Sequence, residues 1–434
     1  MAEWLVEEPW TSVLVIPACN ETPELLRRPP PCPGRSLLIL VINQPESAFP
    51  QVSAANRALA AAVRETMEPA WRPESAAVST GSPIQLFRDP DARRDLLLVD
   101  RFSQGRVMPP RGGVGQARKI GCDLALALFE KGQILSPWIH CSDGDVRLPE
   151  TYFECAGAHA VDDSRVAALI YPFEHVVTGD TEPDVALATQ LYELSLRYYV
   201  AGLRFARSPY AFHTIGSTLA VNARHYAKVR GFPKRDAGED FYLLNKLAKV
   251  GEVQELPSGT DCLPIQIRAR RSNRVPFGTG AAVNAITGLT DPVKDYRYYD
   301  PAVFPLLKLW LKSWPALWAS QSTDFGRLIP PPRPGSADAM RSRDFLVEAL
   351  NEIGTVKALE HAFRQSSDLA QFARQMHTWF DAFKTLKLIH CLRNTHFSSI
   401  DYRAMLIRPE FEQYVNSDPD LAAFFQSVQG RIRI

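Results

Sequence analysis

The chain has 434 residues, which is enough for one large domain or two modest domains with a sizeable core. Hydrophobic residues make up 46% of it and charged residues 22%, as in soluble globular proteins, and the formal net charge is +1. This charge gives no global field that would indicate DNA, RNA or an acidic membrane surface as a partner. The N-terminal segment lacks the basic region of a signal peptide, and no long apolar run indicates a transmembrane helix. We therefore expect a soluble, cytoplasmic protein that does not bind nucleic acid.

The 7 cysteines are scattered along the chain, and none of them belongs to a C-x-x-C pair. An odd number without paired spacing favours buried thiols in a reducing compartment over a disulfide framework or a zinc site. Cys19 and Cys141 lie near the motifs described below, and we expect both to be small buried residues without a nucleophilic role.

The N-terminal part of the chain alternates between short apolar runs, which are typical of buried strands, and segments of helical composition. Residues 51–67 and 116–131 are the helical segments, and the apolar runs end in polar residues. Strands that alternate with helices and short loops predict an α/β fold with a doubly wound, mainly parallel sheet. The predicted strands are residues 12–17, 36–42, 95–99 and 138–140.

The mixed pattern continues to residue 290, after which the sequence becomes helical and aromatic. This change predicts two domains: a catalytic domain over residues 1–290 and an appended α-helical C-terminal region over residues 291–434. Within the first we expect further strands at 165–171 and 213–222 and helices at 151–160, 185–203, 225–230 and 241–250. In the second we expect helices at 304–318, 341–365, 367–388 and 408–427.

An aromatic stripe marks residues 304–318, where leucines and tryptophans, among them Trp314 and Trp318, recur at spacings of three and four. Such a stripe is typical of a helix that packs one face against another part of the protein. We expect it to form the seam between the two domains. Because Lys308 and Lys312 flank it, peripheral contact with a membrane surface stays open as an alternative.

Two carboxylates, Asp143 and Asp145, follow the fourth predicted strand and are separated only by a glycine. The carboxyl edge of an open α/β sheet is where such folds bind ligands. Two adjacent carboxylates suit a divalent cation such as Mg²⁺ or Mn²⁺ that is shared with phosphates. An ordinary surface turn is the alternative, because Gly and Asp are common turn residues.

Five motifs occur in order along residues 12–250, which is somewhat more than half of the chain. They read V-L-V-I-P-A-C-N-E, G-G-V-G-Q-A-R-K-I-G, S-D-G-D, G-S-T-L-A-V-N-A-R-H-Y-A-K-V-R-G-F and G-E-D. In this order and rough spacing they resemble the family 2 glycosyltransferases, which have a GT-A fold. The resemblance implies a hexosyltransferase-type enzyme that transfers a sugar from a nucleoside-diphosphate sugar to a small or soluble acceptor, with Mn²⁺ or Mg²⁺ as cofactor.

The resemblance also implies roles for individual residues of the first three motifs. Asp145 would bind the metal, and Asp143 would reach the metal or the ribose. The alternatives are a strand that simply ends in a polar turn and an ordinary loop-to-helix turn. The residues implied to bind the nucleotide sugar are Pro17, Ala18, Asn20, Glu21, Arg118, Lys119 and Asp143.

The G-E-D motif supplies the candidate catalytic residues. The resemblance makes Asp240 the general base that deprotonates the acceptor hydroxyl, with Glu239 beside it, and an in-line attack would then invert the anomeric centre. If the enzyme retains configuration, Asp240 would only bind the acceptor or the donor sugar. An acidic residue that stabilises a helix N-terminus is the alternative explanation of the motif.

The sequence departs from the family pattern in three places. Asn43 stands where many relatives carry an Asp for the nucleobase, Lys119 replaces a common Asn, and no His lies between residues 226 and 360 to serve as a late metal ligand. A run of arginines in that region offers bidentate clamps for a diphosphate, which would replace or assist a metal ligand. A solvated basic loop is the alternative. The arginines are Arg270, Arg271 and Arg274.

Two further functions stay open. A sugar nucleotidyltransferase would use a similar sheet, although such enzymes usually show a Gly-rich loop ending in Lys after the first strand, and here that segment is acidic. A non-catalytic protein of the same fold would bind a nucleotide or a sugar and use the C-terminal helices for partners.

Overall fold

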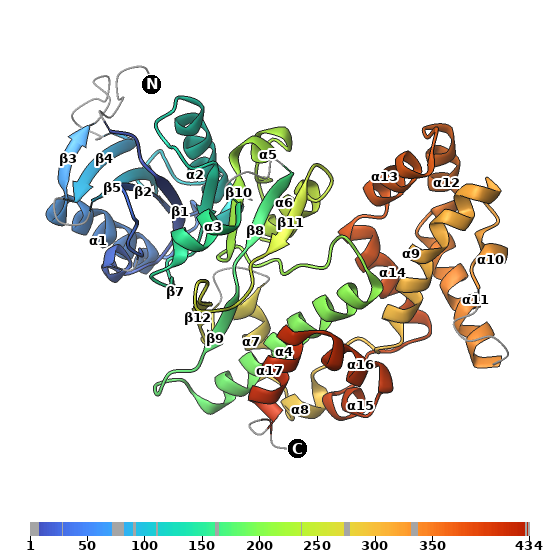
Figure 1. Ribbon diagram of the computed structural model, residues 1–434. Coiled ribbons are helices and arrows are strands. Elements are labelled where there is room, and N and C mark those ends of the chain that lie inside the picture. Colours follow the sequence, from blue (N-terminus) through green and yellow to red (C-terminus); the bar gives the residue numbers. More distant parts are fainter. Residues whose placement is uncertain are drawn as a thin grey trace. The chain divides into compact units, whose positions relative to one another are not determined.

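In the computed structural model the chain forms two compact units (Figure 1). The sheet unit comprises Met1–Thr181 and Thr214–Ala281, and the helical unit comprises Glu182–His213 and Ala282–Ile434. The segment Glu182–His213 thus packs with the C-terminal helices, although it precedes residue 290. The functional division into residues 1–290 and 291–434 stays a prediction. The structure describes residues 8–27, 29–71, 82–89, 93–109, 112–160, 165–235, 237–272, 278–330, 337–429 and 432.

A nine-stranded sheet forms the centre of the sheet unit, in the order β11-β8-β10-β6-β1-β2-β5-β4-β3 (Figure 1). The four central strands β6, β1, β2 and β5 are parallel, as predicted. The sheet as a whole is mixed, because β10 runs antiparallel to both of its neighbours and β4 runs antiparallel to β5 and β3. The strands are β1 (Ser12–Ala18), β2 (Ser36–Asn43), β3 (Glu68–Trp71), β4 (Ile84–Asp89), β5 (Arg94–Arg101), β6 (Trp138–Cys141), β8 (Val166–Ile170), β10 (Leu219–Asn222) and β11 (Glu252–Glu255).

The central strands are apolar without interruption because both faces of the sheet are covered. Successive side chains of a strand point to opposite faces, and every residue of β2 is buried. One face, with Leu14 and Leu38, shares a core with helix α1 (Pro50–Thr66). On the other face, Gly121 of α2 (Gly113–Glu130) lies so close to Val15 that a Cβ at Gly121 would be 2.3 Å from Val15 Cγ1. A doubly wound arrangement follows from this alternation.

Smaller elements complete the sheet unit. A three-stranded sheet has the order β7-β12-β9, with β12 antiparallel to β7 and parallel to β9. Asn222 caps α5, because its side chain accepts the amide hydrogens of Arg224 and His225. The remaining elements are η1 (Pro23–Arg27), β7 (Val146–Arg147), α3 (Tyr152–Ala160), β9 (Phe173–Val176), α5 (Ala223–Lys228), α6 (Glu239–Leu247), β12 (Ile265–Arg268) and α7 (Thr279–Thr287), which runs across the junction at residue 281.

The helical unit is built around α4 and α9. These helices approach closely at Gly202, where a Cβ would lie 2.5 Å from the ring of Phe304. The aromatic stripe predicted for residues 304–318 belongs to α9, and Trp310 and Trp314 are buried in the core of this unit. The structure describes α4 (Pro183–Ala206), α8 (Pro292–Asp295), α9 (Val303–Ser320), α10 (Phe325–Leu328), α11 (Ala337–Glu352), α12 (Thr355–Arg364), α13 (Leu369–Trp379), α14 (Ala382–Thr395), α15 (Tyr402–Leu406), α16 (Pro409–Ser417) and α17 (Pro419–Gln429).

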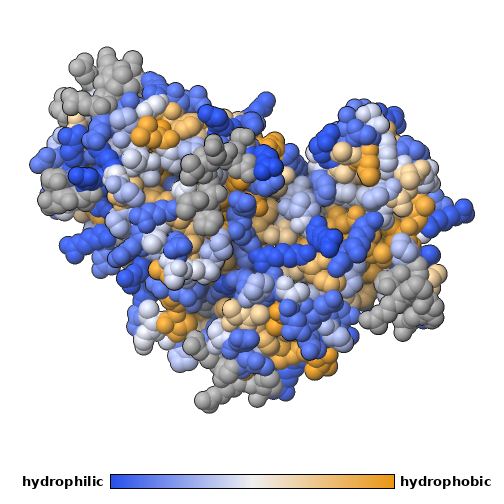
Figure 2. Space-filling view, viewed as in Figure 1, coloured by the Kyte–Doolittle hydropathy of each residue, from blue (hydrophilic) through white to orange (hydrophobic). Residues whose placement is uncertain are grey.

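Trp310 and Trp314 lie inside the core of the helical unit, whereas Trp318 is partly buried against it; peripheral membrane contact stays a prediction. None of the helices in the described part of the chain combines the length and the hydropathy that a membrane span requires. The surface seen in Figure 2 is largely hydrophilic, with hydrophobic residues in separate patches.

Three predicted C-terminal helices are each two shorter helices. Gly354, with φ +87°, separates α11 from α12 inside the segment predicted as 341–365. Asp381 accepts the amide hydrogen of Lys384 and so starts α14 inside the segment predicted as 367–388. Pro419 starts α17 inside the segment predicted as 408–427, since a proline disfavours helical backbone at the preceding residue.

The expectation of seven thiols is wrong, because Cys155 and Cys262 form a disulfide. This bond joins α3 to the turn before β12, and 107 residues separate the two cysteines in sequence. Disulfides persist mainly in oxidising environments, so the pairing does not support the reasoning that led to a reducing compartment. The cytoplasmic location stays a prediction.

The disulfide gives a first testable prediction. Denatured protein should react with an alkylating agent at five cysteines without reductant and at all 7 after reduction. Cys155→Ser should lower the free energy of unfolding by about 2–5 kcal/mol, because the bond restricts the unfolded chain. Unfolding curves with and without reductant measure this loss. Cys391→Ser removes a free thiol and serves as the control, and an equal loss in both variants would contradict the prediction.

Candidate active site

The candidate site lies at the carboxyl edge of the central strands. β1 has β2 on one side and β6 on the other, so the loops after β1 and β6 leave the sheet at a point where the strand order reverses. Such a switch point is where open α/β sheets bind ligands. The antiparallel pairing of Leu219 with Cys141 brings the segment before β10 to the same edge. Ser142 ties these segments together, because its amide donates to Val15 O at 3.1 Å and its hydroxyl donates to Ser217 O at 3.2 Å.

The loop from Asp143 to Asp145 packs against the segment that follows β1. A Cβ at Gly144 would lie 2.4 Å from Leu25 Cδ1 and 2.9 Å from Glu21 Cγ. The glycine of this acidic motif is therefore required by a close approach of two loops, which an ordinary surface turn would not need. Glu21, predicted to bind the nucleotide, is consequently a neighbour of the loop and is almost completely buried.

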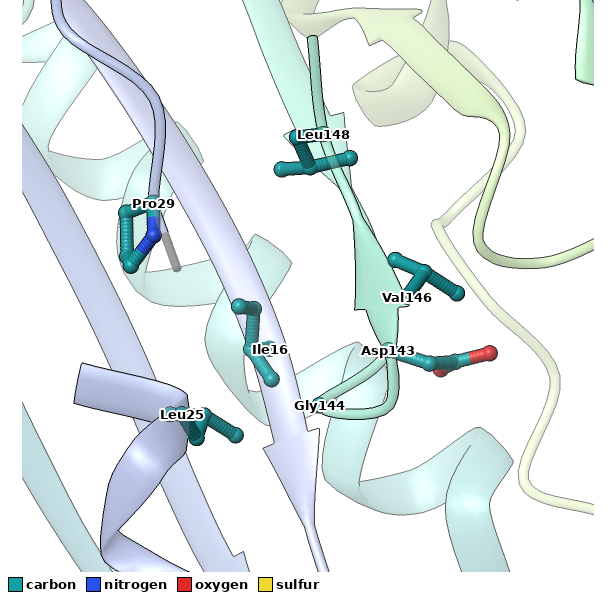
Figure 3. Close-up of a pocket in the computed structure, with 7 residues that line it drawn as sticks. All are labelled: Ile16, Leu25, Pro29, Asp143, Gly144, Val146 and Leu148. Carbon is teal, nitrogen blue, oxygen red and sulfur yellow. The ribbon is translucent and has the colours of Figure 1, made fainter. Parts of the chain in front are cut away.

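A small apolar hollow lies beside this loop (Figure 3). Its walls are the side chains of Ile16, Leu25, Pro29, Val146 and Leu148, together with the loop itself. In Figure 3 the carboxylate of the aspartate before the glycine points away from Ile16 and Leu25. That carboxylate is thus directed away from the hollow, and its Oδ1 accepts a hydrogen bond from Arg118.

Arg118 of α2 joins the two acidic motifs of the sequence. Its Nη2 donates to Asp143 Oδ1, and its Nη1 donates to Glu239 Oε1. The side chain is only 2% exposed. Burial alone would lower the pKa of this guanidinium, but the charges of Asp143 and Glu239 outweigh burial and raise it. Arg118 is therefore a permanent buried cation whose contacts are with carboxylates of the protein; its predicted contact with the nucleotide stays a prediction.

Glu239 and Asp240 are adjacent in sequence but differ in environment. Glu239 is 3% exposed, and burial raises its pKa to about 7 even though Arg118 opposes the shift. Asp240 is partly exposed, and it accepts the Phe241 amide hydrogen at 2.7 Å and the Gly216 amide hydrogen. Burial also raises the pKa of Asp240, with Arg118 acting against it. Of the two, only Asp240 combines a raised pKa with access for a ligand.

The second aspartate of the acidic loop has its own arginine. Arg270, which follows β12, donates from Nη2 to Asp145 Oδ2. The neighbouring Arg271 is exposed. The structure therefore brings at least one of the predicted arginines to the acidic loop, whereas Arg274 lies outside the described residues.

The predicted nucleotide-binding residues of the first motif divide into two kinds. Pro17 and Ala18 are buried within β1. Asn20 is exposed in a left-handed conformation, with φ 60°, and its amide donates to Asn56 Oδ1 at 3.0 Å. Lys119 binds Asp123 and the carbonyl of Arg230, so its amine is directed to the end of α5.

An amide network that the sequence reasoning missed supports the loop after β1. Asn56 Nδ2 donates to Asn43 O and to Gln44 Oε1, at 3.0 and 3.1 Å. Asn43, noted as a replacement for an Asp, donates from Nδ2 to Ala18 O and Val41 O, both at 3.1 Å. The signal that could have revealed this network is the polar side chain of Asn56 within a helical segment. Asn56 is fully buried, and buried polar groups need hydrogen-bond partners.

The carboxylates of the acidic loop are the kind of oxygen ligand that Mg²⁺ or Mn²⁺ prefers. The side chains of Asp143 and Asp145 are 36% and 26% exposed, so both reach the surface while also meeting arginines. Within the described ranges, no three Asp, Glu, His or Cys side chains are close enough to hold a metal ion alone. Mg²⁺ usually takes one or two carboxylates and completes its shell with substrate phosphates and water.

Comparison with known proteins gives only distant similarity. No protein-family model matches the sequence, and no curated protein matches it. Among solved structures, it is similar to TarS 1–349 of S. aureus at 10% identity and TM-score 0.35, over 89% of this chain and 93% of that one. It is also similar to the mannosyltransferase PcManGT from Pyrobaculum calidifontis in complex with GDP-Man and Mn²⁺, at 13% identity and TM-score 0.34, over 90% and 88%. At these scores neither similarity supports an argument about activity.

The raised pKa of Glu239 gives a second prediction, on stability. Burial raises the pKa of Glu239 to about 7 in the folded protein from an ordinary value of 4.5, so the folded state holds the proton more tightly than the unfolded chain does. The contribution of Glu239 to the free energy of unfolding is therefore fully present below pH 4.5 and is lost as the pH rises to 7. The loss amounts to at most about 3 kcal/mol. Urea unfolding from pH 4.5 to 8 measures it.

The matched variants are Glu239→Gln, in which this pH dependence should disappear, and Glu65→Gln, in which it should persist because Glu65 is exposed on α1. An unchanged pH dependence in Glu239→Gln would show that another group is responsible.

Proposed function

We propose that this chain is a glycosyltransferase that transfers a sugar from a nucleoside-diphosphate sugar to a hydroxyl group of a small or soluble acceptor. One observation carries the proposal: Arg118 binds Asp143 and Glu239, which brings two acidic motifs that are distant in sequence together at the switch point of a parallel-centred sheet. A diphosphate donor requires cations near its phosphates, and an acceptor hydroxyl requires a base. The site offers a place for a cation at the acidic loop and a candidate base at the start of α6.

On the donor side, Asp143 and Asp145 would hold a divalent cation together with the diphosphate. Bound there, the cation would neutralise the negative charge that develops on the departing diphosphate. Arg270, now paired with Asp145, is close enough to turn towards the phosphates. Asn20 and Glu21 would contact the nucleoside, since they follow β1 at the same edge.

On the acceptor side, Asp240 would act as the general base. It takes the proton of the acceptor hydroxyl as that oxygen forms a bond to the anomeric carbon and the bond from this carbon to the diphosphate oxygen breaks. An attack opposite the leaving group inverts the anomeric configuration. The raised pKa of Asp240 makes its carboxylate a stronger base than an exposed Asp, and the Gly216 amide orients it.

Nucleotide binding gives the third prediction. UDP, GDP, ADP, CDP and dTDP should each be tested by thermal shift with and without Mn²⁺, because a ligand that binds only the folded state raises the melting temperature. We expect one nucleotide to raise the melting temperature, and the increase to be larger in the presence of Mn²⁺. In Asp145→Ala the additional shift from Mn²⁺ should disappear. If no nucleotide shifts the wild-type protein, the glycosyltransferase proposal fails.

The fourth prediction concerns the base. Asp240→Asn should lower the turnover of the best sugar nucleotide by about 10²–10⁴-fold, as expected for loss of a general base. It should keep the thermal shift with the nucleotide, because the side chain faces the acceptor. Release of nucleoside diphosphate measures turnover. Wild-type turnover in Asp240→Asn would remove Asp240 from this role.

A further inference from the structure

Arg118 occupies a slot that is built for a guanidinium. A Cβ at Gly216, in the segment before β10, would lie 2.1 Å from Arg118 Nη1. A Cβ at Gly115, on α2, would lie 2.6 Å from Arg235 O and 2.9 Å from the Cβ of Glu239. Neither glycine has a positive φ, so close approach, rather than an unusual backbone conformation, explains the absence of a side chain. Gly216 thus leaves room for the guanidinium of Arg118, and Gly115 lets the segment before α6 approach α2 closely.

Stability alone is a weak reason for such an arrangement. Burying an ion pair costs desolvation free energy, and the attraction between the two charges often does no more than offset this cost. Well-packed apolar residues at the same place commonly stabilise the fold equally well. The pair does, however, fix geometry: a guanidinium presents its donors in a rigid planar fork. With one partner on the loop after β6 and the other at the start of α6, Arg118 fixes the separation of these two segments.

That separation matters for the proposed reaction. Glu239 and Asp240 begin α6, so the anchoring of Glu239 to Arg118 also sets the position of the proposed base. Asp143 belongs to the loop that would face the diphosphate. In a reaction that needs the donor carbon, the hydroxyl and the base in line, a displacement of about 1 Å costs about 100-fold in rate.

We propose that Arg118 is a positioning residue that sets the distance between the donor-side loop at Asp143 and the base Asp240 through its contact with Glu239. This inference rests on the proposed glycosyltransferase function. Arg118 contacts neither reacting group in this role; it acts through its two carboxylate partners.

The helical unit offers a matched control. Arg197 of α4 also binds two carboxylates, Glu193 and Asp420. In each arginine cluster one partner is nearly buried and one is partly exposed: Glu193 and Asp420 are 2% and 39% exposed, against 4% and 36% for Glu239 and Asp143. Substitutions at Arg197 therefore disturb a buried arginine of the same kind in the helical unit, which contains neither acidic motif.

The test compares Arg118→Lys and Arg118→Gln with Arg197→Lys and Arg197→Gln. Turnover is measured as release of nucleoside diphosphate, with water as acceptor, from the sugar nucleotide on which the wild-type chain is most active. The Tm of each variant and its binding of the matching nucleoside diphosphate are measured as well. Lysine keeps the charge but lacks the fork. We expect Arg118→Lys to keep its nucleotide binding while kcat falls about 100-fold and KM changes by less than about threefold. Both Arg197 variants should keep the wild-type kcat when they are assayed at temperatures below their Tm.

A second perturbation leaves every charge in place. Gly216→Ala presses on the guanidinium and should lower kcat in the same way, whereas Gly157→Ala, whose Cβ would meet no atom within 4 Å, should not. If Arg118→Lys and Gly216→Ala both keep wild-type kcat, Arg118 only stabilises the fold and the inference is overturned. A wild-type chain that neither binds a nucleoside diphosphate nor turns over any sugar nucleotide would instead overturn the proposed function, and this inference with it.

Discussion

A single buried positive charge holds the candidate site together. Asp143, Glu239 and Asp240 would repel one another at this edge of the sheet if Arg118 did not stand among them, and each of these carboxylates interacts electrostatically with it. The remainder of the site is consistent with this requirement. Gly216 leaves room for the guanidinium, and the Gly216 amide in turn binds Asp240. The loss of the cation would therefore affect the loop after β6, the segment before β10 and the first turn of α6 together.

The topology of the sheet explains why these groups meet at all. Parallel strands bring their carboxyl ends to one edge, and the reversal of strand order at β1 opens that edge to a ligand. The antiparallel strand β10 begins where β6 ends, so its preceding loop joins the same edge. The loop after β6 and the segment before β10 thus meet at one edge, and the hydrogen bonds of Ser142 connect the loop after β6 to β1 and to the segment before β10.

Much of the central sheet could be predicted from sequence because its strands are local signals. Residues 12–17, 36–42, 95–99 and 138–140 are apolar at successive positions, which fits strands covered on both faces, and all four are strands. The acidic loop at residues 143–145 was also placed correctly at a strand end. The edge strand β11 of the central sheet and the strand β9 of the smaller sheet are short and alternate weakly, so their place depends on neighbours that the sequence does not reveal.

The parts that escaped prediction depend on contacts between distant residues. Nothing local marks Cys155 and Cys262 as partners, because 107 residues separate them. The same holds for Asn56, whose partners Asn43 and Gln44 lie on another element. The sequence predicts that Arg118 binds the nucleotide sugar, but only the fold reveals that its guanidinium contacts carboxylates of the protein.

The path of the chain between the two units has a consequence for how the protein can be divided. The chain leaves the sheet unit after residue 181, forms α4 in the helical unit, and returns at residue 214 to add β10 and α6. Each unit is therefore discontinuous in sequence, and no single cut yields either of them whole. A fragment ending at residue 290 would contain α4 without the C-terminal helices that bury Leu194 and Tyr198. A gene that encodes the sheet unit alone would need a designed connection from residue 181 to residue 214 in place of α4.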